Sequence, residues 1–341
     1  MEKTKRVALF TLGCKLNFSE TSTIARKFTD FGYEKVDFND QADVYVINTC
    51  SVTDIADKKC RNAIQKAIKQ SPEAQVIVVG CYAQLSPEIL NAIEGVDLVL
   101  SNQDKDNIVE LVELGRKGYS SCDFKELKEF SSACSIDDRT RSFLKIQDGC
   151  DYFCSYCTIP KARGLSRSDS IKNVIDKTQY IVSKGIKEIV LTGVNTGDFG
   201  RKNGESLYEL LTNLHKVKGL DRLRISSIEP NLLDNNIINL ASQSSLIMPH
   251  FHIPLQCGVD KLLVSMHRRY TTDFFRERVN YIRQLIPQSY ISIHIILCVP
   301  GESHYDFNHT IEFLKSINLS QLHIFTYSQI PHTQPIKIEQ V

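Results

Sequence analysis

The sequence predicts an α/β protein, with an N-terminal parallel α/β sandwich domain followed by an open (β/α)6 partial barrel. Along the 341 residues, short apolar runs of strand length alternate with longer amphipathic stretches. This alternation is typical of a parallel sheet covered by helices. It is lost over residues 119–141 and then begins a second time. We therefore expect a first domain over 1–118, a linker over 119–141 and a second domain over 142–341.

The first domain is predicted from short buried strands with helices between them. Runs of this kind suit strands of a parallel sheet, which are covered on both faces. The expected strands are Val7–Phe10, Val44–Ile47, Val76–Val79 and Val96–Leu100, and the expected helices lie near Ser19–Phe31, Ala56–Lys69 and Pro87–Glu94. This order of elements predicts a mostly parallel sheet.

The second domain is predicted from six further strands in sequence order. They are Phe143–Ile146, Glu188–Leu191, Leu223–Ser226, His250–Ile253, Ile291–Leu297 and Leu322–Phe325. Right-handed crossovers between successive parallel strands would curl such a series into an open barrel. The active site of a barrel of this kind is expected at the carboxyl ends of its strands.

Composition places the chain among ordinary globular proteins and excludes two classes. Charged residues make up 24% of the chain and hydrophobic residues 42%, with a formal net charge of +1. The chain is too large for a secreted disulfide scaffold, and no charged-then-apolar leader opens it. No apolar stretch approaches the roughly 18–20 residues that a membrane span needs. We therefore expect a cytoplasmic protein without a membrane partner, whose cysteines are reduced and bind metal.

Three cysteines within eight residues are the clearest chemical signal. Cys150, Cys154 and Cys157 lie in the segment DGCDYFCSYCTIP, and we call them the loop cysteines. Three thiolates can bind three irons of a cubane iron–sulfur cluster and leave the fourth iron open, whereas clusters that only transfer electrons are usually closed by four cysteines. An open iron can hold a small molecule, so this spacing indicates catalysis.

A second set of cysteines is predicted to meet in space. Cys14, Cys50 and Cys81 each come just after a predicted strand, and we call them the strand-end cysteines. The carboxyl ends of parallel strands share one edge of a sheet, where ligands usually bind. Gly13 and Gly80 precede two of them and would let the backbone approach a bulky cluster. The remaining cysteines lack this placement and are expected to be core or incidental thiols: Cys60, Cys122, Cys134, Cys257 and Cys298.

Several longer segments together resemble one enzyme family. They are TLGCKLNFSETSTI, INTCSVTDIADKKCRNAI, GCYAQ, FLKIQDGCDYFCSYCTIPKARGLSRS, EIVLTGVNTGDFG, RISSIEP and HFHIPLQ, which together span about residues 6–327. These segments are similar to those of the methylthiotransferases, radical S-adenosylmethionine enzymes. They most resemble the MtaB type, which acts on N6-threonylcarbamoyladenosine in tRNA.

The resemblance implies a tRNA-modifying transferase with two 4Fe-4S clusters and S-adenosyl-L-methionine. The loop cysteines would hold the cluster that generates a radical from S-adenosylmethionine. The strand-end cysteines would hold an auxiliary cluster that carries the sulfur to be inserted. The acceptor would be ring position 2 of the modified adenine beside the anticodon. Implied partners are the tRNA anticodon loop and an electron donor such as flavodoxin or ferredoxin, and the chain is expected to be a monomer.

Cofactor contacts are predicted with less support from pattern alone. The resemblance places Tyr156 beside the adenine, although packing under the loop would explain it equally well. Gly193 and Asn195 belong to the GVNTG segment after the second barrel strand, where small residues let a ligand approach the backbone. Ser226 and Gln256 come at the ends of the next two strands. Satisfied core polar residues are the alternative for both positions.

RNA binding would need basic side chains near the chemistry, because contacts to phosphates supply affinity without reading sequence. The set expected to contact tRNA follows the loop cysteines: Lys161, Arg163 and Arg167. Two other basic groups are Lys58, Lys59 and Arg61 in the first domain and Arg268 and Arg269 in the second.

The last quarter of the chain departs from the family pattern. Cys257 and Val259 replace the two serines of the family's LQSGSD segment, and His294 and Cys298 replace an aspartate and a glycine. The small C-terminal TRAM domain that family members usually carry is expected to be absent. Two alternatives therefore stay open. One is a related radical enzyme with a different acceptor, and the other is an inactive remnant that still binds clusters or tRNA.

Overall fold

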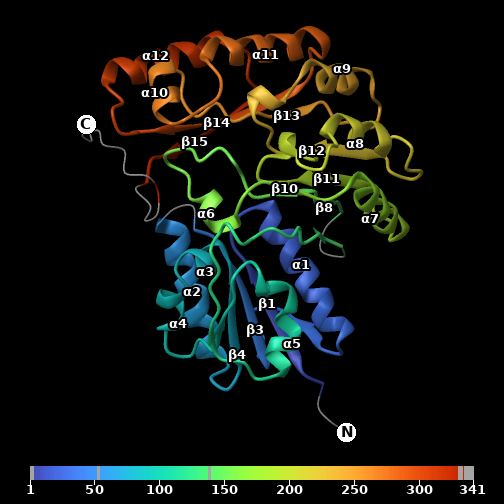
Figure 1. The fold of residues 1–341 in the computed structure, drawn as a ribbon, viewed down its shortest axis with the longest axis vertical. Helices are drawn as coiled ribbons and strands as arrows, with labels where there is room; N and C mark the ends of the chain where they lie inside the picture. The colour runs from blue at the N-terminus through green and yellow to red at the C-terminus, as the bar shows by residue number, and fades with distance from the viewer. Residues whose placement is uncertain (1–3, 52–53, 137–139, 329–332, 334–341) are drawn as a thin grey trace. The chain divides into compact units, whose positions relative to one another are not determined.

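The computed structural model describes residues 4–51, 54–136, 140–328 and 333 (Figure 1). Contacts divide the chain into two compact units: unit 1 comprises residues 1–139 and 158–165, and unit 2 comprises 140–157 and 166–341. The boundary falls at the end of the predicted linker. The segment directly after the loop cysteines groups with unit 1. Residues 137–139 of the linker and most of the stretch after 328 lie outside the described residues.

Unit 1 is built on a six-stranded parallel sheet in the order β2-β1-β3-β4-β5-β6. Its strands are β1 (Arg6–Thr11), β2 (Glu34–Val36), β3 (Val44–Thr49), β4 (Gln75–Gly80), β5 (Leu98–Val99) and β6 (Gly118–Tyr119). The four predicted strands are present. The two that the sequence pattern missed, β2 and β6, are short edge or near-edge strands without a buried apolar run, so no hydrophobic signal marks them.

Helices cover both faces of this sheet (Figure 1). Ile24 and Phe28 of α1 and Ile108 of α5 pack on one face, while Ile64 and Leu90, from α2 and α4, pack on the other. The helices of unit 1 are α1 (Lys15–Asp30), α2 (Asp54–Gln70), α3 (Cys81–Leu85), α4 (Pro87–Asn91), α5 (Ile108–Glu113) and α6 (Ile159–Arg163), with a 3-10 turn η1 (Asp104–Asn107). The three predicted helices are present, and this arrangement is the expected parallel α/β sandwich.

The linker prediction needs one addition. Strand β7 (Ala133–Cys134) lies within it and packs against α1. Arg26 Nη2 donates to the Cys134 carbonyl oxygen at 2.6 Å, and the Cys134 amide donates to Thr23 Oγ1 at 3.2 Å. This part of the segment is therefore anchored by polar contacts, which hydrophobic periodicity does not register.

Unit 2 contains the six predicted barrel strands in the predicted order. They are β8 (Ser142–Lys145), β11 (Glu188–Thr192), β12 (Arg222–Ile225), β13 (His250–His252), β14 (Tyr290–Leu297) and β15 (Gln321–Thr326). Parallel pairing joins β12-β11-β8 in one sheet and β13-β14-β15 in another. A parallel bridge joins Leu223 of β12 to Ile247, three residues before β13. The strands therefore form the open (β/α)6 partial barrel.

The helices of unit 2 lie in the connections between these strands. They are α7 (Ile171–Ser183), α8 (Leu207–Leu214), α9 (Asn235–Gln243), α10 (Asp260–Ser265), α11 (Thr272–Leu285) and α12 (His304–Ser316), with η2 (Thr196–Asp198) and η3 (Pro230–Leu232). A small antiparallel pair, β9 (Gln147–Asp148) with β10 (Arg167–Ser168), follows the first barrel strand. The loop cysteines directly follow β9. No helix in the described part of the chain is long and apolar enough to cross a membrane.

Candidate functional sites

The strand-end cysteines lie at one edge of the unit 1 sheet. Cys14 caps the start of α1, Cys50 follows β3, and Cys81 is the first residue of α3 after β4. A Cβ added at Gly13 would lie 2.9 Å from Cys50 Sγ. Burial raises the pKa of the Cys81 thiol, Arg163 opposes that rise, and a thiolate at Cys14 adds to it. These relations place the three cysteines near one another at this edge, as strand topology predicted.

Two glycines make this edge possible. Gly13 and Gly80 have φ of +97° and +98°, a region that other residues rarely adopt. A Cβ at Gly80 would lie 2.5 Å from the Thr49 carbonyl oxygen. The backbone is therefore close-packed where β1 and β4 end, and a side chain there would displace the loops that carry the cysteines.

Beside these cysteines lies a network of buried charged groups. Arg163 Nη1 and Lys105 Nζ both contact Glu20 Oε1, at 3.1 and 2.8 Å. Arg163 Nη2 also donates to Asn17 Oδ1, and Asn17 Nδ2 donates to the carbonyl oxygens of Leu12 and Thr49, the latter at the end of β3. Only 1% of Arg163 is exposed. Buried cations of this kind favour the thiolate form of Cys81.

The burial of Arg163 corrects one sequence prediction. We expected this residue to contact tRNA, but its guanidinium is enclosed in unit 1 and bonded to Glu20. Lys161, on the same helix, is half-buried. Arg167 is half-buried as well and contacts Asp148 Oδ2 at 3.4 Å. A run of basic residues in the sequence does not show which side chains face solvent and which pair with acidic groups in the core.

The loop cysteines follow β9 on a tight irregular loop of unit 2. Gly149 and Phe153 both have positive φ, +70° and +50°, and the Cys157 amide donates to the Cys154 carbonyl oxygen at 2.9 Å. The Ser155 amide donates to the Met266 carbonyl oxygen at 3.4 Å. Burial raises the pKa of the Cys150 thiol to about 12. A bound metal would replace that proton, because a coordinating thiol is deprotonated outright.

Arg268 directly contacts one of the loop cysteines, Cys154. Its Nη1 donates to Cys154 Sγ at 3.2 Å and to the Tyr156 hydroxyl at 3.4 Å, and its Nη2 forms an ion pair with Glu229. From the sequence, Arg268 was expected among the basic residues that contact RNA. That expectation is wrong, because Arg268 is buried. Glu229 was missed, although it lies in the RISSIEP segment that resembles the family. A lone glutamate after a strand carries no signal of its partner.

Tyr156 is therefore tied to the loop by a polar contact and is not only packing. Burial raises its pKa well above the ordinary value, while Arg268 lowers it. The hydroxyl stays neutral and can accept the contact from Arg268. Exposed Arg269 stacks on Tyr152, with its guanidinium carbon 4.0 Å from the ring centroid, and Tyr152 accepts from Asn231 Nδ2 at 2.8 Å. Two tyrosines of the loop are thus held by neighbouring side chains: Tyr156 by Arg268, and Tyr152 by Arg269 and Asn231.

Gln147 organises the rim beside the second barrel strand. Its Nε2 donates to the carbonyl oxygens of Asp148 and Gly149 and to Ser166 Oγ. Its Oε1 accepts from the Asn195 amide at 2.8 Å, and a Cβ at Gly193 would lie 2.8 Å from that same oxygen. This close approach explains the glycine in GVNTG. Gln147 was not predicted, because a glutamine inside an apolar run gives no pattern.

Several buried polar atoms on this rim have no hydrogen-bond partner among the described residues. They are both side-chain atoms of Asn195, Gln256 Oε1, Thr192 Oγ1 and Ser155 Oγ. An unsatisfied buried polar group is costly and requires an explanation. Asn195 and Gln256 were predicted to bind the cofactor, and these atoms fit a ligand with amino and carboxylate groups. Ser226 follows β12, and its amide donates to the Leu191 carbonyl oxygen at 3.0 Å.

Gln256 is held by a chain of histidines inside the barrel. Its amide nitrogen lies 2.8 Å from His294 Nε2, His294 Nδ1 lies 3.2 Å from His252 Nε2, and His252 Nδ1 lies 2.8 Å from Ser292 Oγ. An amide nitrogen only donates, so with this orientation each imidazole accepts at one nitrogen and donates at the other. Burial lowers the pKa of His294 to about 3. The histidine that departs from the family pattern is thus a neutral link that leaves Gln256 Oε1 free.

Within the described residues, no group of three or more His, Cys, Asp and Glu side chains is arranged to hold a single metal ion. A cubane cluster binds its cysteines at separate irons, so its ligands need not converge on one point. Of the cysteines expected to be core or incidental thiols, Cys60, Cys134 and Cys257 are buried. Cys298 is exposed and Cys122 is partly buried.

Two known protein families match the chain, one in unit 1 and the other in the part of the chain that forms most of unit 2. The family described as "Uncharacterized protein family UPF0004" matches residues 6–101, and the radical SAM superfamily matches residues 144–314. The first match spans the sheet with the strand-end cysteines. The second spans the loop cysteines and most of the barrel.

Curated relatives match nearly the whole chain. It is 41% identical to the protein named threonylcarbamoyladenosine tRNA methylthiotransferase MtaB from Bacillus subtilis, over 98% of this chain and 76% of that protein. The protein of the same name from Aquifex aeolicus is 40% identical over 98% of this chain and 83% of its own length. A tRNA-2-methylthio-N(6)-dimethylallyladenosine synthase from Sulfurihydrogenibium is 30% identical over 95% of this chain and 76% of that protein.

Among solved structures, the fold is similar to that of a radical S-adenosylmethionine methyltransferase, TsrM, from Kitasatospora setae. The TM-score is 0.71 at 13% identity, over 97% of this chain and 77% of that protein. At this identity the likeness concerns the fold alone. It extends over both units of the chain.

Proposed function

Since the chain belongs to the radical S-adenosylmethionine tRNA methylthiotransferases, we propose that its acceptor is N6-threonylcarbamoyladenosine beside the anticodon. The relatives that carry this acceptor in their names are 40–41% identical, against 30% for the dimethylallyladenosine synthase. The chain would transfer a methylthio group to ring position 2 of that adenine. The alternative of an inactive remnant has no support from the two cysteine sets, which are both complete.

We propose that the chain holds two clusters, one at each set of cysteines. The loop cysteines belong to the superfamily match, and their surroundings supply Arg268 to one thiol. The strand-end cysteines do not form a contiguous motif, but they lie at one edge of the sheet, where Gly13 and Gly80 let the backbone pack closely. The observation that carries the proposal is this pairing of two separate thiol triads in one chain.

S-adenosylmethionine would be held at the rim formed by the barrel strands. Asn195 and Gln256 offer unsatisfied polar atoms, and Gly193 lets Gln147 pack closely against the segment that carries Asn195. Gly193, Tyr156 and Ser226 would border the same ligand. When bound to a reduced cluster, this cofactor supplies the radical that removes an unreactive hydrogen. Arg268 and Glu229 hold the loop in place, and the buried surroundings exclude water from the reacting atoms.

We further propose that Lys161 and Arg167 lie near the bound tRNA, and that flavodoxin or ferredoxin delivers the electron. The protein would act as a monomer in the cytoplasm, where its tRNA substrate is. The target base would have to leave its stack to reach the cofactor, as enzymes that modify bases generally require.

Mass spectrometry of tRNA nucleosides tests the proposed acceptor. A host strain lacking its own enzyme of this type should accumulate N6-threonylcarbamoyladenosine and regain the 2-methylthio form when this gene is supplied. A chain with Cys154→Ala should not restore it. Unchanged nucleosides with the intact gene, or methylthiolation of an isopentenyl-type adenosine in its place, would refute the proposal.

A further inference from the structure

Among the described residues, no helix covers the part of the unit 1 sheet that lies beside α2, over β1 and β2. Helix α2 links β3 to β4 and packs over those strands, while α1 packs on the opposite face. Strands β2 and β1 lie at the end of the sheet order. On the α2 side, the apolar residues of these two strands and the loop after β2 are therefore only partly buried: Phe10, Leu12, Val36 and Phe38.

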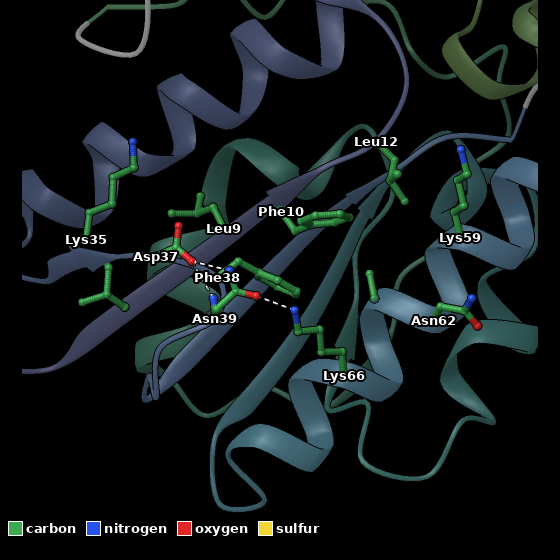
Figure 2. Close-up of a pocket in the computed structure, with 12 residues that line it drawn as sticks. Leu9, Phe10, Leu12, Lys35, Asp37, Phe38, Asn39, Lys59, Asn62 and Lys66 are labelled. Carbon is green, nitrogen blue, oxygen red and sulfur yellow. Dashed lines mark hydrogen bonds between the residues drawn. The ribbon is translucent and has the colours of Figure 1, made fainter.

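This uncovered flank forms a cavity of about 820 Å³, which we call the β1–α2 cleft (Figure 2). Phe10 and Phe38 lie within it, with ring centroids 4.7 Å apart. A volume in the range of roughly 300–1,000 Å³ is typical of a small-molecule site and would admit one nucleotide. The cleft therefore offers aromatic surface in a space of nucleotide size.

The rim of the β1–α2 cleft is mainly basic. The described residues that line it include Lys35, Lys59 and Lys66, against a single acidic residue, Asp37. The carboxylate of Asp37 accepts hydrogen bonds from the Asn39 amide and side chain, which hold the loop after β2. Lys66 reaches across the cleft and donates to Asn39 Oδ1 (Figure 2). An ammonium has three protons to donate, so this contact leaves it able to bind an anion.

The basic surface continues along α2 beyond the cleft. Lys66 and Asn62 also line a second hollow, together with Lys69 and Gln65 of the same helix. Lys59, Lys66 and Lys69 are exposed and recur at helical spacing on one side of α2. At 1.5 Å per residue the stripe is about 15 Å long. A linear series of cations fits a chain of phosphates better than a compact anion.

Two residues that line the cleft are close in the chain to cysteines at the strand-end edge. Leu12 lines it and lies two residues before Cys14. Lys59 lines it as well and precedes Cys60, whose thiol donates to the Cys50 carbonyl oxygen at 3.4 Å. An RNA strand that followed this groove would therefore pass near the edge of the sheet where the strand-end cysteines lie.

We propose that the β1–α2 cleft and the stripe on α2 bind a single-stranded segment of the substrate tRNA. Lys59, Lys66 and Lys69 contact phosphates, and a base enters the cleft against Phe10 and Phe38. Single-stranded nucleic acids are bound in this way, by a basic groove with aromatic side chains on which bases stack. The inference rests on the proposed function for the identity of the RNA. An acidic electron-donor protein could also meet a basic rim, but the concave cleft and the linear stripe favour RNA.

Binding of a fluorescent anticodon stem–loop RNA to the full chain tests this site, followed by anisotropy across a salt series. The test variant is Lys59→Glu/Lys66→Glu, and the matched control is Lys172→Glu/Lys184→Glu, which makes the same charge change on α7 and at its C-cap residue. We expect the test variant to weaken binding by tenfold or more. It should also reduce the magnitude of the slope of log K against log salt concentration by roughly 1.4 to 2, as expected for the loss of two phosphate contacts. The control should change both by much less.

Phe38→Leu separates stacking from charge. Loss of a stacked base should weaken RNA binding roughly five- to tenfold, at the low end of the alanine-based range because leucine keeps apolar bulk. Binding of inorganic polyphosphate, which has no bases, should not change. The thermal midpoint of each variant shows whether it is folded.

Two results would overturn the proposal: equal losses in the test and control variants, or unchanged RNA affinity in the test variant. The second result could come with slower reduction of the clusters by flavodoxin. That combination would assign the cleft to a protein partner. Cleavage of S-adenosylmethionine without RNA should be normal in the test variant. If tRNA nucleosides never change yet the anisotropy results hold, the proposed function fails while the RNA site stands.

Discussion

The two cysteine sets are held by different means. The loop cysteines lie within eight residues after β9, so local backbone alone brings them together. The strand-end cysteines are separated by 36 and 31 positions and meet only because β1, β3 and β4 are parallel neighbours. A local site can survive loosening of its surroundings, whereas a site assembled by a sheet depends on the packing of the whole unit. The two sites should therefore respond differently to substitutions in their surroundings.

The largest effect is expected at Gly80. Gly80→Ala places a Cβ 2.5 Å from the Thr49 carbonyl oxygen, in a region of φ that alanine disfavours. Overpacking and the left-handed backbone together should lower the free energy of unfolding by roughly 2–5 kcal/mol. Urea denaturation measures this loss, and iron analysis should show loss of the strand-end cluster alone.

Gly118→Ala is the matched control. Gly118 has φ of +95°, but a Cβ there meets nothing within 4 Å. It should cost only the backbone penalty of about 1 kcal/mol and leave the iron content unchanged. Equal effects of the two substitutions would show that close packing at the strand end is not what holds the strand-end site.

A slightly smaller loss is expected when the buried charge network is broken. Arg163→Met leaves Glu20 with Lys105 alone and removes a contact to Cys81. Loss of one partner of a buried ion pair should cost about 3 kcal/mol, again read from urea denaturation. Lys161→Met, on the same short helix, should cost less than about 1 kcal/mol. If Arg163→Met proved neutral, the network would not be supporting the strand-end pocket.

His294 should make the barrel sensitive to acid. Its pKa is lowered from 6.5 to about 3 by burial, so below pH 6.5 the unfolded chain binds a proton that the folded chain does not. Stability should therefore fall as pH decreases from about 6.5 toward 3. Between pH 7 and 5 this histidine should account for roughly 2 kcal/mol. His294→Asn should remove that share of the pH dependence, whereas substitution of the exposed His304 should keep the wild-type slope.

The smallest predicted effect concerns the loop cysteines and is electronic. Arg268→Gln removes a positive charge 3.2 Å from Cys154 Sγ. Without that charge, addition of an electron to a cluster at the loop cysteines is less favourable. The midpoint potential of that cluster should fall, on the order of 60 mV, because the Glu229 carboxylate already offsets part of the charge. Redox titration followed by electron paramagnetic resonance measures the shift. A potential that stays the same, or moves at the strand-end cluster only, would contradict the assignment.

Sequence alone predicted the elements that depend on hydrophobic pattern. The four first-domain strands, the six barrel strands and the edge location of Cys14, Cys50 and Cys81 all follow from buried runs and parallel topology. Strands β2 and β6 were missed because they are short and bury few side chains. The roles of Arg163 and Arg268 were also misjudged. A basic residue looks the same in a sequence whether it faces solvent or a buried carboxylate.

Polar partners were the main part of the candidate sites that the sequence could not supply. Gln147 and Glu229 act through contacts with residues far away in the chain, Asn195 and Arg268. His294 stood out only as a departure from a familiar segment. Its chain of contacts to His252 and Gln256 requires two neighbouring strands in register. Such pairings depend on tertiary structure and produce no periodic pattern in the sequence.

The most direct test of the account is the iron content of the anaerobically purified chain and of two variants that each lack one cysteine set. Two cubane clusters predict about eight irons per chain. Replacement of the loop cysteines with alanine, or of the strand-end cysteines, should leave about four in each case, and only the first variant should lose reductive cleavage of S-adenosylmethionine. About four irons in the intact chain, or an unchanged count after loss of Cys14, Cys50 and Cys81, would contradict the two-cluster account.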